Sequence, residues 1–134
     1  MSQSEEQVLV IPTAILHEAG LFQGLCRDVE HYQPRLLDPA HFSYLPRDRA
    51  ELNPAFKQLI PYVVLKYHDQ VFHYTRGQGS GEKRLRALRS VGIGGHLNPI
   101  DQDAGAHPYR QGMLREVAEE ITLGSAYRET CLGF

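Results

Sequence analysis

Short apolar runs dominate the hydrophobic pattern of this chain, and most of them predict strands. Residues 7–12 form one such run, which ends in a proline and predicts a first strand. Residues 61–67 and 70–76 are rich in β-branched and aromatic side chains and flank a short polar turn, so together they predict a β-hairpin. A further strand is predicted around residues 90–93, where the chain enters a cluster of glycines.

One segment near the end of the chain has a helical period and predicts a helix that begins near Pro108 and ends by residue 123 or 124. Its apolar face is formed by Leu114, Val117, Ala118 and Ile121. Glu116, Glu119 and Glu120 fall within an arc of roughly 100° on the opposite face. Like charges so placed cost only about 0.2–0.5 kcal/mol, so this face becomes informative only if a cation lies in front of it.

The remaining segments predict short elements. Residues 13–25 are interrupted by glycines and predict a helical turn followed by a loop. Four prolines within residues 27–60 exclude long helices there, and residues 41–47 are a candidate strand. Residues 98–108 are loop-like, and residues 126–134 are a candidate last strand. Several strands, one strong helix and a possible final strand predict an α+β fold and not a regular βαβ alternation.

Length, charge and cysteine content narrow the classes of protein. A chain of 134 residues predicts one domain, and a net charge of −2 gives no reason to expect nucleic acid as a partner. The polar, acidic start is not a targeting signal, and no apolar run reaches the ~18 residues that cross a bilayer. Cys26 and Cys131 are far apart and read as free thiols. We therefore expect a cytoplasmic protein that does not bind membranes.

Candidate chemistry is concentrated where the glycines at residues 92–95 are followed by the helix with three glutamates. A strand that runs into glycines lets the backbone approach a ligand or present a carbonyl to a metal. Carboxylates are the hard oxygen ligands that Mg²⁺ and Mn²⁺ prefer. Arg115, four residues before Glu119, is placed to pair with it. Such a site suits metal-assisted hydrolysis at a diphosphate.

The same segment resembles the Nudix box, whose pattern is G-x5-E-x7-R-E-U-x-E-E-x-G-U, with U a bulky aliphatic residue. Residues 115–120, REVAEE, match R-E-U-x-E-E without a mismatch, and Gly95 suits the opening glycine. The resemblance implies a Nudix fold, in which a mixed β-sheet lies between helices and the box forms a loop, a helix and a loop. It also implies Mg²⁺-dependent cleavage of a nucleoside diphosphate linked to another moiety.

The resemblance also implies roles for individual residues. Glu119 and Glu120 match the glutamate pair that binds metal in the family, and Glu116 matches a further metal ligand or base. Gly95 would offer its carbonyl to the metal, and we expect Arg115 to orient the carboxylates. The predicted catalytic residues are therefore Arg115, Glu116, Glu119 and Glu120, and the predicted cofactor is Mg²⁺ or Mn²⁺.

The match departs from the pattern in three ways. Counted forward from the opening glycine, the glutamate position holds Asp101, and thirteen residues instead of seven then precede Arg115, an insertion of six. Counted backward from Arg115, the glutamate position falls on His107 and the glycine position on Asp101. The later glycine of the pattern is replaced by Thr122. The sequence leaves both registers open.

The box covers about residues 92–124, which places a Nudix-like core at 60–134 and leaves residues 1–59 as an N-terminal extension of unclear role, packed on the same domain. A Nudix fold normally continues well beyond its box, whereas only about a dozen residues follow it here. We therefore expect a sheet that is incomplete at the C-terminus. An exposed edge recruits partners, so we also expect self-association, for example as a homodimer.

Substrate contacts have both functional and ordinary interpretations. Arg84 and Arg86 lie in a basic run at residues 82–89, and Arg76 ends the predicted hairpin. All three are candidates for binding an anionic substrate, although such a run is also typical of a solvated face. His96 is open between capping a loop and contacting substrate. Three aromatic residues are candidates either for stacking on a base or for the core: Tyr62, Tyr67 and Phe72.

Three functions follow from the sequence. The leading one is a Mg²⁺- or Mn²⁺-dependent Nudix-like hydrolase that cleaves a diphosphate linkage in a small phosphorylated or nucleotide substrate. The second is an inactive Nudix-like module that binds a nucleotide or a partner protein, which the altered box favours. The third is an isomerase of phosphorylated isoprenoids, which would require a cysteine near the site, and neither Cys26 nor Cys131 has an evident place there.

Overall fold

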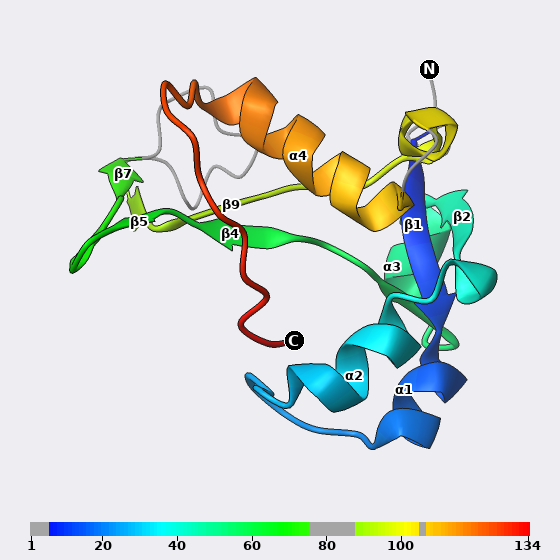
Figure 1. Ribbon diagram of the computed structural model, residues 1–134. Coiled ribbons are helices and arrows are strands. Elements are labelled where there is room, and N and C mark those ends of the chain that lie inside the picture. The colour runs from blue at the N-terminus through cyan, green and yellow to red at the C-terminus, as the bar shows by residue number, and fades with distance from the viewer. Residues whose placement is uncertain (1–5, 76–87, 105–106) are drawn as a thin grey trace.

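The protein consists of two parts, a small sheet with short helices and an arm of paired strands crossed by a longer helix. The computed structural model describes residues 6–75, 88–104 and 107–134. In Figure 1 the small sheet and its helices occupy the right and the bottom of the molecule, and the strand arm extends to the left. The sheet, the helices and the arm together form the predicted α+β architecture.

The small sheet is built around the first strand. β1 (Gln7–Pro12) lies between β2 (Ser43–Pro46) and β3 (Phe56–Gln58) and is antiparallel to both. Residues 8–11 of β1 are each at most 2% exposed. A strand covered on both faces needs apolar residues at every position, which explains why residues 7–12 show no alternation. The predictions of strands at residues 7–12 and within 41–47 are confirmed.

Apolar clusters cover both faces of β1, because successive side chains point to opposite faces of a strand. One cluster contains the buried residues Ile11, Ala19, Tyr32 and Leu36, contributed by β1, α1 (Thr13–Ala19) and α2 (Val29–Leu36). The other contains Val8, Val10 and Ala50, contributed by β1 and α3 (Arg47–Leu52). The core of the small sheet therefore lies within residues 6–59.

Prolines limit the helices between residues 27 and 60, as predicted. Pro46 immediately precedes α3, and Pro39 opens the short 3₁₀ helix η2 (Pro39–His41), where the Asp38 side chain accepts a hydrogen bond from the Ala40 N–H. One proline departs from this pattern, since α2 continues through Pro34 to Leu36. The burial of Tyr32 and Leu36 in the core stabilises this last turn against the local cost of the proline.

The predicted hairpin over residues 61–76 is present only at its tip. There β5 (Lys66–Tyr67) pairs with β6 (Gln70–Val71) around His68, which has a φ of 51°. β4 (Tyr62–Val64) pairs instead with β9 (Gly92–Gly94), far along the chain. This pairing places Ile93 against α4, where it is 3% exposed. Tertiary burial of Ile93 thus overrides the local hairpin preference of the longer strands.

A third strand pair completes the arm. β7 (Tyr74–Thr75) pairs with β8 (Arg89–Ser90), and the Tyr74 hydroxyl donates to the Gly92 carbonyl at 2.8 Å. Every strand pair in the described ranges is antiparallel. The prediction of a strand around residues 90–93 is confirmed, with a break between β8 and β9 at Val91.

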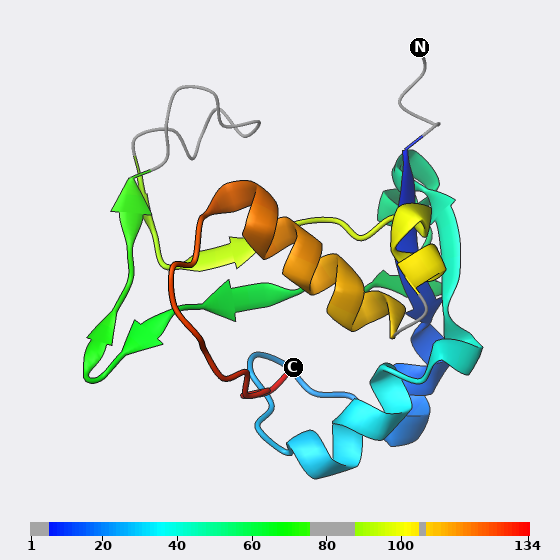
Figure 2. The same ribbon diagram turned by 45° about the horizontal axis from the view of Figure 1, so that its top comes forward.

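The longer helix, α4 (Pro108–Glu120), lies across β4 and β9 (Figure 2). It begins at the predicted proline and ends a few residues earlier than predicted, because Ile121 is extended. The segment before it, predicted as a loop, contains the 3₁₀ helix η4 (Pro99–Ala104). None of the helices in the described ranges has the length and apolar character needed to cross a bilayer.

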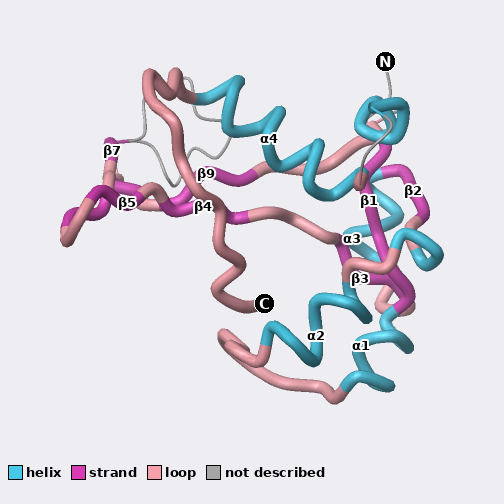
Figure 3. The backbone as a smooth tube through the Cα atoms, in the orientation of Figure 1, coloured by secondary structure: helices cyan, strands magenta, loops and turns pink. Residues whose placement is uncertain are grey.

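Residues 121–134 contain no helix or strand, so the prediction of a last strand there is wrong (Figure 3). This tail is held by contacts along its length. Arg110 of α4 donates to both Glu129 carboxylate oxygens at 2.6 and 3.2 Å, and Cys26 and Phe134 exchange backbone hydrogen bonds at 2.8 and 2.9 Å. These contacts, with Phe134 packed against the α1–α2 cluster, replace strand pairing.

The small sheet with its helices lies within residues 6–59, the arm and α4 follow it in the chain, and the two parts contact each other. The Leu9 N–H donates to the Leu97 carbonyl at 3.0 Å, so β1 reaches the segment between β9 and η4. His107, at the start of α4, is hydrogen-bonded to the Leu37 carbonyl at the end of α2. Residues 6–59 therefore pack directly on the segment that contains the box.

Candidate functional site

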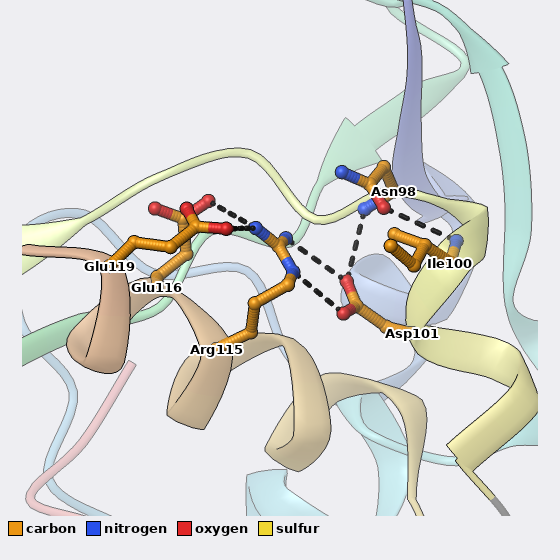
Figure 4. Close-up of polar contacts among 6 residues, drawn as sticks. All are labelled: Asn98, Ile100, Asp101, Arg115, Glu116 and Glu119. Carbon is orange, nitrogen blue, oxygen red and sulfur yellow. Dashed lines mark hydrogen bonds and ion pairs between the residues drawn. The ribbon is translucent and has the colours of Figure 1, made fainter.

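Arg115 of α4 is bound by a buried aspartate. Its Nε and Nη2 atoms donate to the Asp101 carboxylate at 2.9 and 3.2 Å (Figure 4). Asp101 is 4% exposed and lies in η4, where its Oδ2 also accepts from the Asn98 N–H at 3.3 Å. A buried carboxylate is tolerated when it is paired and hydrogen-bonded, and a two-pronged arginine contact is the strongest form of that pairing. The contact therefore fixes α4 against η4.

The third guanidinium nitrogen of Arg115 faces two glutamates. Nη1 lies 3.3 Å from Glu116 Oε1 and 3.1 Å from Glu119 Oε1. The predicted ion pair between Arg115 and Glu119 is thus present, and Arg115 is the cation in front of the glutamate face. Hydrogen bonding to Asp101, and then to Glu119, raises the pKa of Arg115 above its ordinary value. Glu120 is exposed and contacts none of these groups in the described part of the chain.

Gly95 lies directly against Glu116. A Cβ built on Gly95 would overlap the Glu116 carboxylate, so only a glycine permits this approach without displacing the carboxylate. Burial raises the pKa of Glu116, the positive charge of Arg115 lowers it, and the negative charges of Glu119 and Glu120 raise it further. A partly buried carboxylate among other carboxylates is a favourable place for an additional positive charge.

The structure distinguishes the two registers of the box. Counting from Gly95 reaches Asp101, which is the residue that binds Arg115. His107, the alternative, has its Nε2 atom 2.6 Å from the Leu37 carbonyl, and its ring packs edge-on against Phe42 at 5.5 Å. The forward register therefore brings an acid to the arginine, whereas the backward register places a histidine between α2 and α4.

No family model matches the chain, whereas comparison with known proteins finds significant similarity both to a curated protein and to a solved structure. Protein YmaB of Bacillus subtilis (strain 168) is 36% identical over 127 residues, which cover 92% of this chain and 62% of YmaB. The crystal structure of Tm1382, a proposed Nudix hydrolase, matches at 35% identity with a TM-score of 0.63. That match covers 87% of this chain and 58% of Tm1382.

The chain has a Nudix-like fold. Shared fold and 35% sequence identity with Tm1382 confirm both the resemblance found in residues 115–120 and the predicted fold class. The chain spans less than two thirds of the length of YmaB and of Tm1382.

The sequence analysis did not single out Gly112 and Leu97, which shape this Nudix-like site. Gly112 lies one helical turn before Glu116, and a Cβ at Gly112 would come within 2.8 Å of Asp101 Oδ2 and overlap the side chain of Leu97. Leu97 is 1% exposed. The absence of a side chain at Gly112 thus allows α4 to approach η4 closely enough for Arg115 to reach Asp101. A glycine within a helical pattern was the available signal, because it often marks a close packing contact.

His96, which follows Gly95, contacts the small sheet. Its Nδ1 lies 2.9 Å from Oε1 of Gln58 on β3. Burial and the nearby positive charge of Arg47 lower the pKa of His96, so its ring is neutral at physiological pH. Of the two interpretations that the sequence left open, this contact favours a role in holding the loop.

Some candidate substrate-binding residues lie on the arm, and the others fall outside the described residues. Arg76, Arg84 and Arg86 belong to the second group. Tyr62 is paired with Gly94, so both lie on the face of the β4–β9 pair opposite Val63 and Ile93, which face α4. The Tyr62 ring covers Gly92 there and is 64% exposed. Tyr67 and Phe72 are 73% and 45% exposed, so the core interpretation of these aromatic residues is wrong.

The donor set of this Nudix-like site is suitable for a hard cation, although the side chains are not gathered as a complete metal site. Glu116 and Glu119 converge on one nitrogen of Arg115, and the Gly95 backbone lies beside Glu116. Within residues 6–75, 88–104 and 107–134, no three acidic, histidine or cysteine side chains are grouped to hold a metal. Carboxylate and carbonyl oxygens nevertheless fit Mg²⁺ or Mn²⁺ in kind.

Proposed function

We propose that this protein is a Nudix-like hydrolase that uses Mg²⁺ or Mn²⁺ to cleave a diphosphate linkage in a small phosphorylated or nucleotide substrate. The observation that carries the proposal is the convergence of Glu116 and Glu119 on a single cationic nitrogen, with Gly95 against the Glu116 carboxylate. This arrangement joins the two ends of the box at one point that favours positive charge. The match to Tm1382 supports the same reaction class.

Each box residue has a role in this proposal. Glu119 and Glu120 hold the metal together with the Gly95 carbonyl, and Glu116 is a further ligand or positions the attacking water. Arg115, held by Asp101, orients Glu116 and Glu119. A bound metal would neutralise negative charge on the diphosphate and lower the pKa of a water bound to it. The Glu119 side chain is 57% exposed, so its ion pair with Arg115 contributes little free energy and the side chain can turn toward a metal at low cost.

The remaining assignments rest on the sequence. We propose that Arg76, Arg84 and Arg86 bind the phosphate groups of the substrate, because guanidinium groups pair with phosphate oxygens in a two-pronged geometry. We also propose that the protein works in the cytoplasm, and that it forms a homodimer through strand edges of the arm that have no partner strand within residues 6–75, 88–104 and 107–134.

A second candidate is a non-catalytic Nudix-like module that binds a nucleotide or a partner protein. The absence of a grouped three-ligand metal site in the described residues favours it, because Arg115 satisfies the carboxylates without a metal. The isomerase alternative has no comparable support. Cys26 is hydrogen-bonded to Phe134 near α2, and Cys131 lies in the tail with its thiol directed at the Gly133 carbonyl.

Mn²⁺ binding measured by calorimetry tests the proposal, with the wild type compared with Glu119→Gln/Glu120→Gln. A control variant, Glu129→Gln, removes an acid that pairs with Arg110 on the tail. We expect the double variant to lose binding and the control to retain it, and we expect hydrolysis of nucleoside diphosphate compounds to follow the same order. Wild-type binding that survives in the double variant would refute the metal assignment. Nucleotide binding without metal binding or turnover would establish the second candidate.

A further inference from the structure

The short segment that joins β9 to η4 is held differently at each of its residues. Gly94 is paired with Tyr62 of β4, and the Leu97 carbonyl accepts from the Leu9 N–H of β1 at 3.0 Å. Between these two anchors, neither Gly95 nor His96 makes a backbone–backbone hydrogen bond to any residue in the described ranges. The path of the backbone at Gly95 is therefore not determined by pairing with a strand.

The His96 side chain supplies the missing anchor. Its Nδ1 atom lies 2.9 Å from Gln58 Oε1 on β3, and both residues are partly buried. An amide oxygen can only accept, so the Nδ1 atom carries the proton and donates to it. This single hydrogen bond ties the loop to the small sheet immediately after Gly95.

Gly95 needs such an anchor more than another residue would. A glycine has the widest range of backbone conformations and cannot fix its own orientation by packing a side chain. It must nevertheless stay against the Glu116 carboxylate, where even a methyl group would overlap. A small rotation at Gly95 would turn its carbonyl away from the Glu116 carboxylate or push its backbone against that carboxylate.

We propose that Gln58 is a positioning residue for the Nudix-like site: its hydrogen bond to His96 fixes the Gly95 peptide beside Glu116. This inference rests on the proposed function, in which the Gly95 carbonyl and Glu116 share a metal. It assigns a function to β3 and thereby to residues 1–59, for which the sequence suggested no role. Groups that orient metal ligands without touching the metal typically change affinity by about 10- to 100-fold when they are removed.

The decisive variant is Gln58→Leu, which retains the side-chain size and loses the acceptor. Gln58→Glu restores an acceptor oxygen at the same reach and is the rescue variant. Lys57→Leu is the matched control, because Lys57 is the neighbouring residue on β3 and its side chain points to the other face of the strand. Mn²⁺ affinity by calorimetry, the electron paramagnetic resonance spectrum of bound Mn²⁺, and hydrogen exchange of the Leu9 amide, which donates to the Leu97 carbonyl, are measured on all four proteins.

We expect Gln58→Leu to weaken Mn²⁺ binding about tenfold and to change the Mn²⁺ spectrum. Exchange of the Leu9 amide should speed up, because a loosened loop holds the Leu97 carbonyl less firmly. Gln58→Glu and Lys57→Leu should stay within about twofold of the wild type. Equal weakening in Gln58→Leu and Lys57→Leu, or wild-type affinity and spectrum in Gln58→Leu, would overturn the proposal.

Failure of the proposed function itself gives a different result. If the wild type binds no Mn²⁺, the metal assignment fails, and the exchange measurement still decides whether Gln58 holds Gly95. Unchanged exchange of the Leu9 amide in Gln58→Leu would overturn the positioning role whether or not metal binds. Faster exchange confined to Gln58→Leu, together with metal binding that weakens only in that variant, would establish it.

Discussion

Two nitrogens of Arg115 hold the two carboxylate oxygens of Asp101, at 2.9 and 3.2 Å, across the contact between α4 and η4. The remaining nitrogen of Arg115 is directed at Glu116 and Glu119. One side chain thus joins the forward half of the box, counted from Gly95, to its helical half despite the six-residue insertion. The buried Asp101 anchors the guanidinium group of Arg115, and the positive charge of that group faces Glu116 and Glu119.

Asp101→Asn should destabilise the protein strongly, because it leaves Arg115 without its buried ionic partner. We expect the free energy of unfolding to fall by about 2–3 kcal/mol in urea denaturation. Glu129→Gln is the matched control, since it breaks another two-pronged contact, with Arg110, that is more exposed, and should cost less than about 1 kcal/mol. A loss in Asp101→Asn no larger than in the control would show that the pair does not hold η4 on α4.

Gly95→Ala should disturb the site, because the added methyl group would overlap the Glu116 carboxylate. We expect Mn²⁺ affinity to fall about tenfold as Glu116 is displaced. Gly124→Ala provides the comparison, since a methyl group there would meet no atom within 4 Å. Calorimetry on both variants checks the expectation. Wild-type affinity in Gly95→Ala would show that close approach at this position is not required.

Tyr44→Phe should stabilise the protein. The Tyr44 hydroxyl is buried and has no hydrogen-bond partner among the described residues, and burial, then the charge of Asp101, raises its pKa. Removing an unsatisfied hydroxyl should raise the free energy of unfolding by about 1 kcal/mol. Tyr32→Phe should lower it by a similar amount, because the Tyr32 hydroxyl donates to the Gly20 carbonyl at 2.6 Å. Thermal and urea unfolding of the two variants should move in opposite directions.

The pKa of Glu116 makes a specific prediction about pH. Burial is the largest cause that raises this pKa above its ordinary value of 4.5, so the folded protein holds the Glu116 proton more tightly than the unfolded chain does. The stability contributed by this group is therefore present below the ordinary pKa and is lost as pH rises through the raised one.

Urea denaturation without metal, between about pH 4 and pH 7, measures this effect as the difference between the wild type and Glu116→Gln. We expect the stability of the wild type relative to the variant to decrease as pH rises. An increase over that interval would show that pairing with Arg115 outweighs burial, and that the pKa of Glu116 is lowered and not raised.

Local pattern was sufficient for much of this fold. The apolar run at residues 7–12 predicted β1, and its lack of alternation agrees with a strand buried on both faces. The proline at 108 and the helical period after it predicted α4 together with its glutamate face. The pairing of Arg115 with Glu119 followed from their spacing alone. Each of these features depends on residues that are close together in the sequence, as the four-residue spacing of Arg115 and Glu119 shows.

Other features depended on contacts between distant residues. The sequence favoured a continuous hairpin, yet β4 pairs with β9 because that arrangement buries Ile93 beneath α4. It offered two registers for the box, and the close approach at Gly112 that lets Arg115 reach Asp101 decided between them. It left residues 1–59 without a role, whereas Gln58 from that segment reaches His96.

The sequence by itself therefore determined which residues form β1, α4 and the charged face of the helix, because period and proline position act through adjacent turns of the chain. Tertiary structure decided which strand pairs with β4, which acid meets Arg115 and what holds Gly95. These outcomes depend on the burial of a few side chains, such as Ile93, Leu97 and Asp101, against segments far away in the sequence. Packing of that kind is a property of the whole folded chain and leaves no local pattern to read.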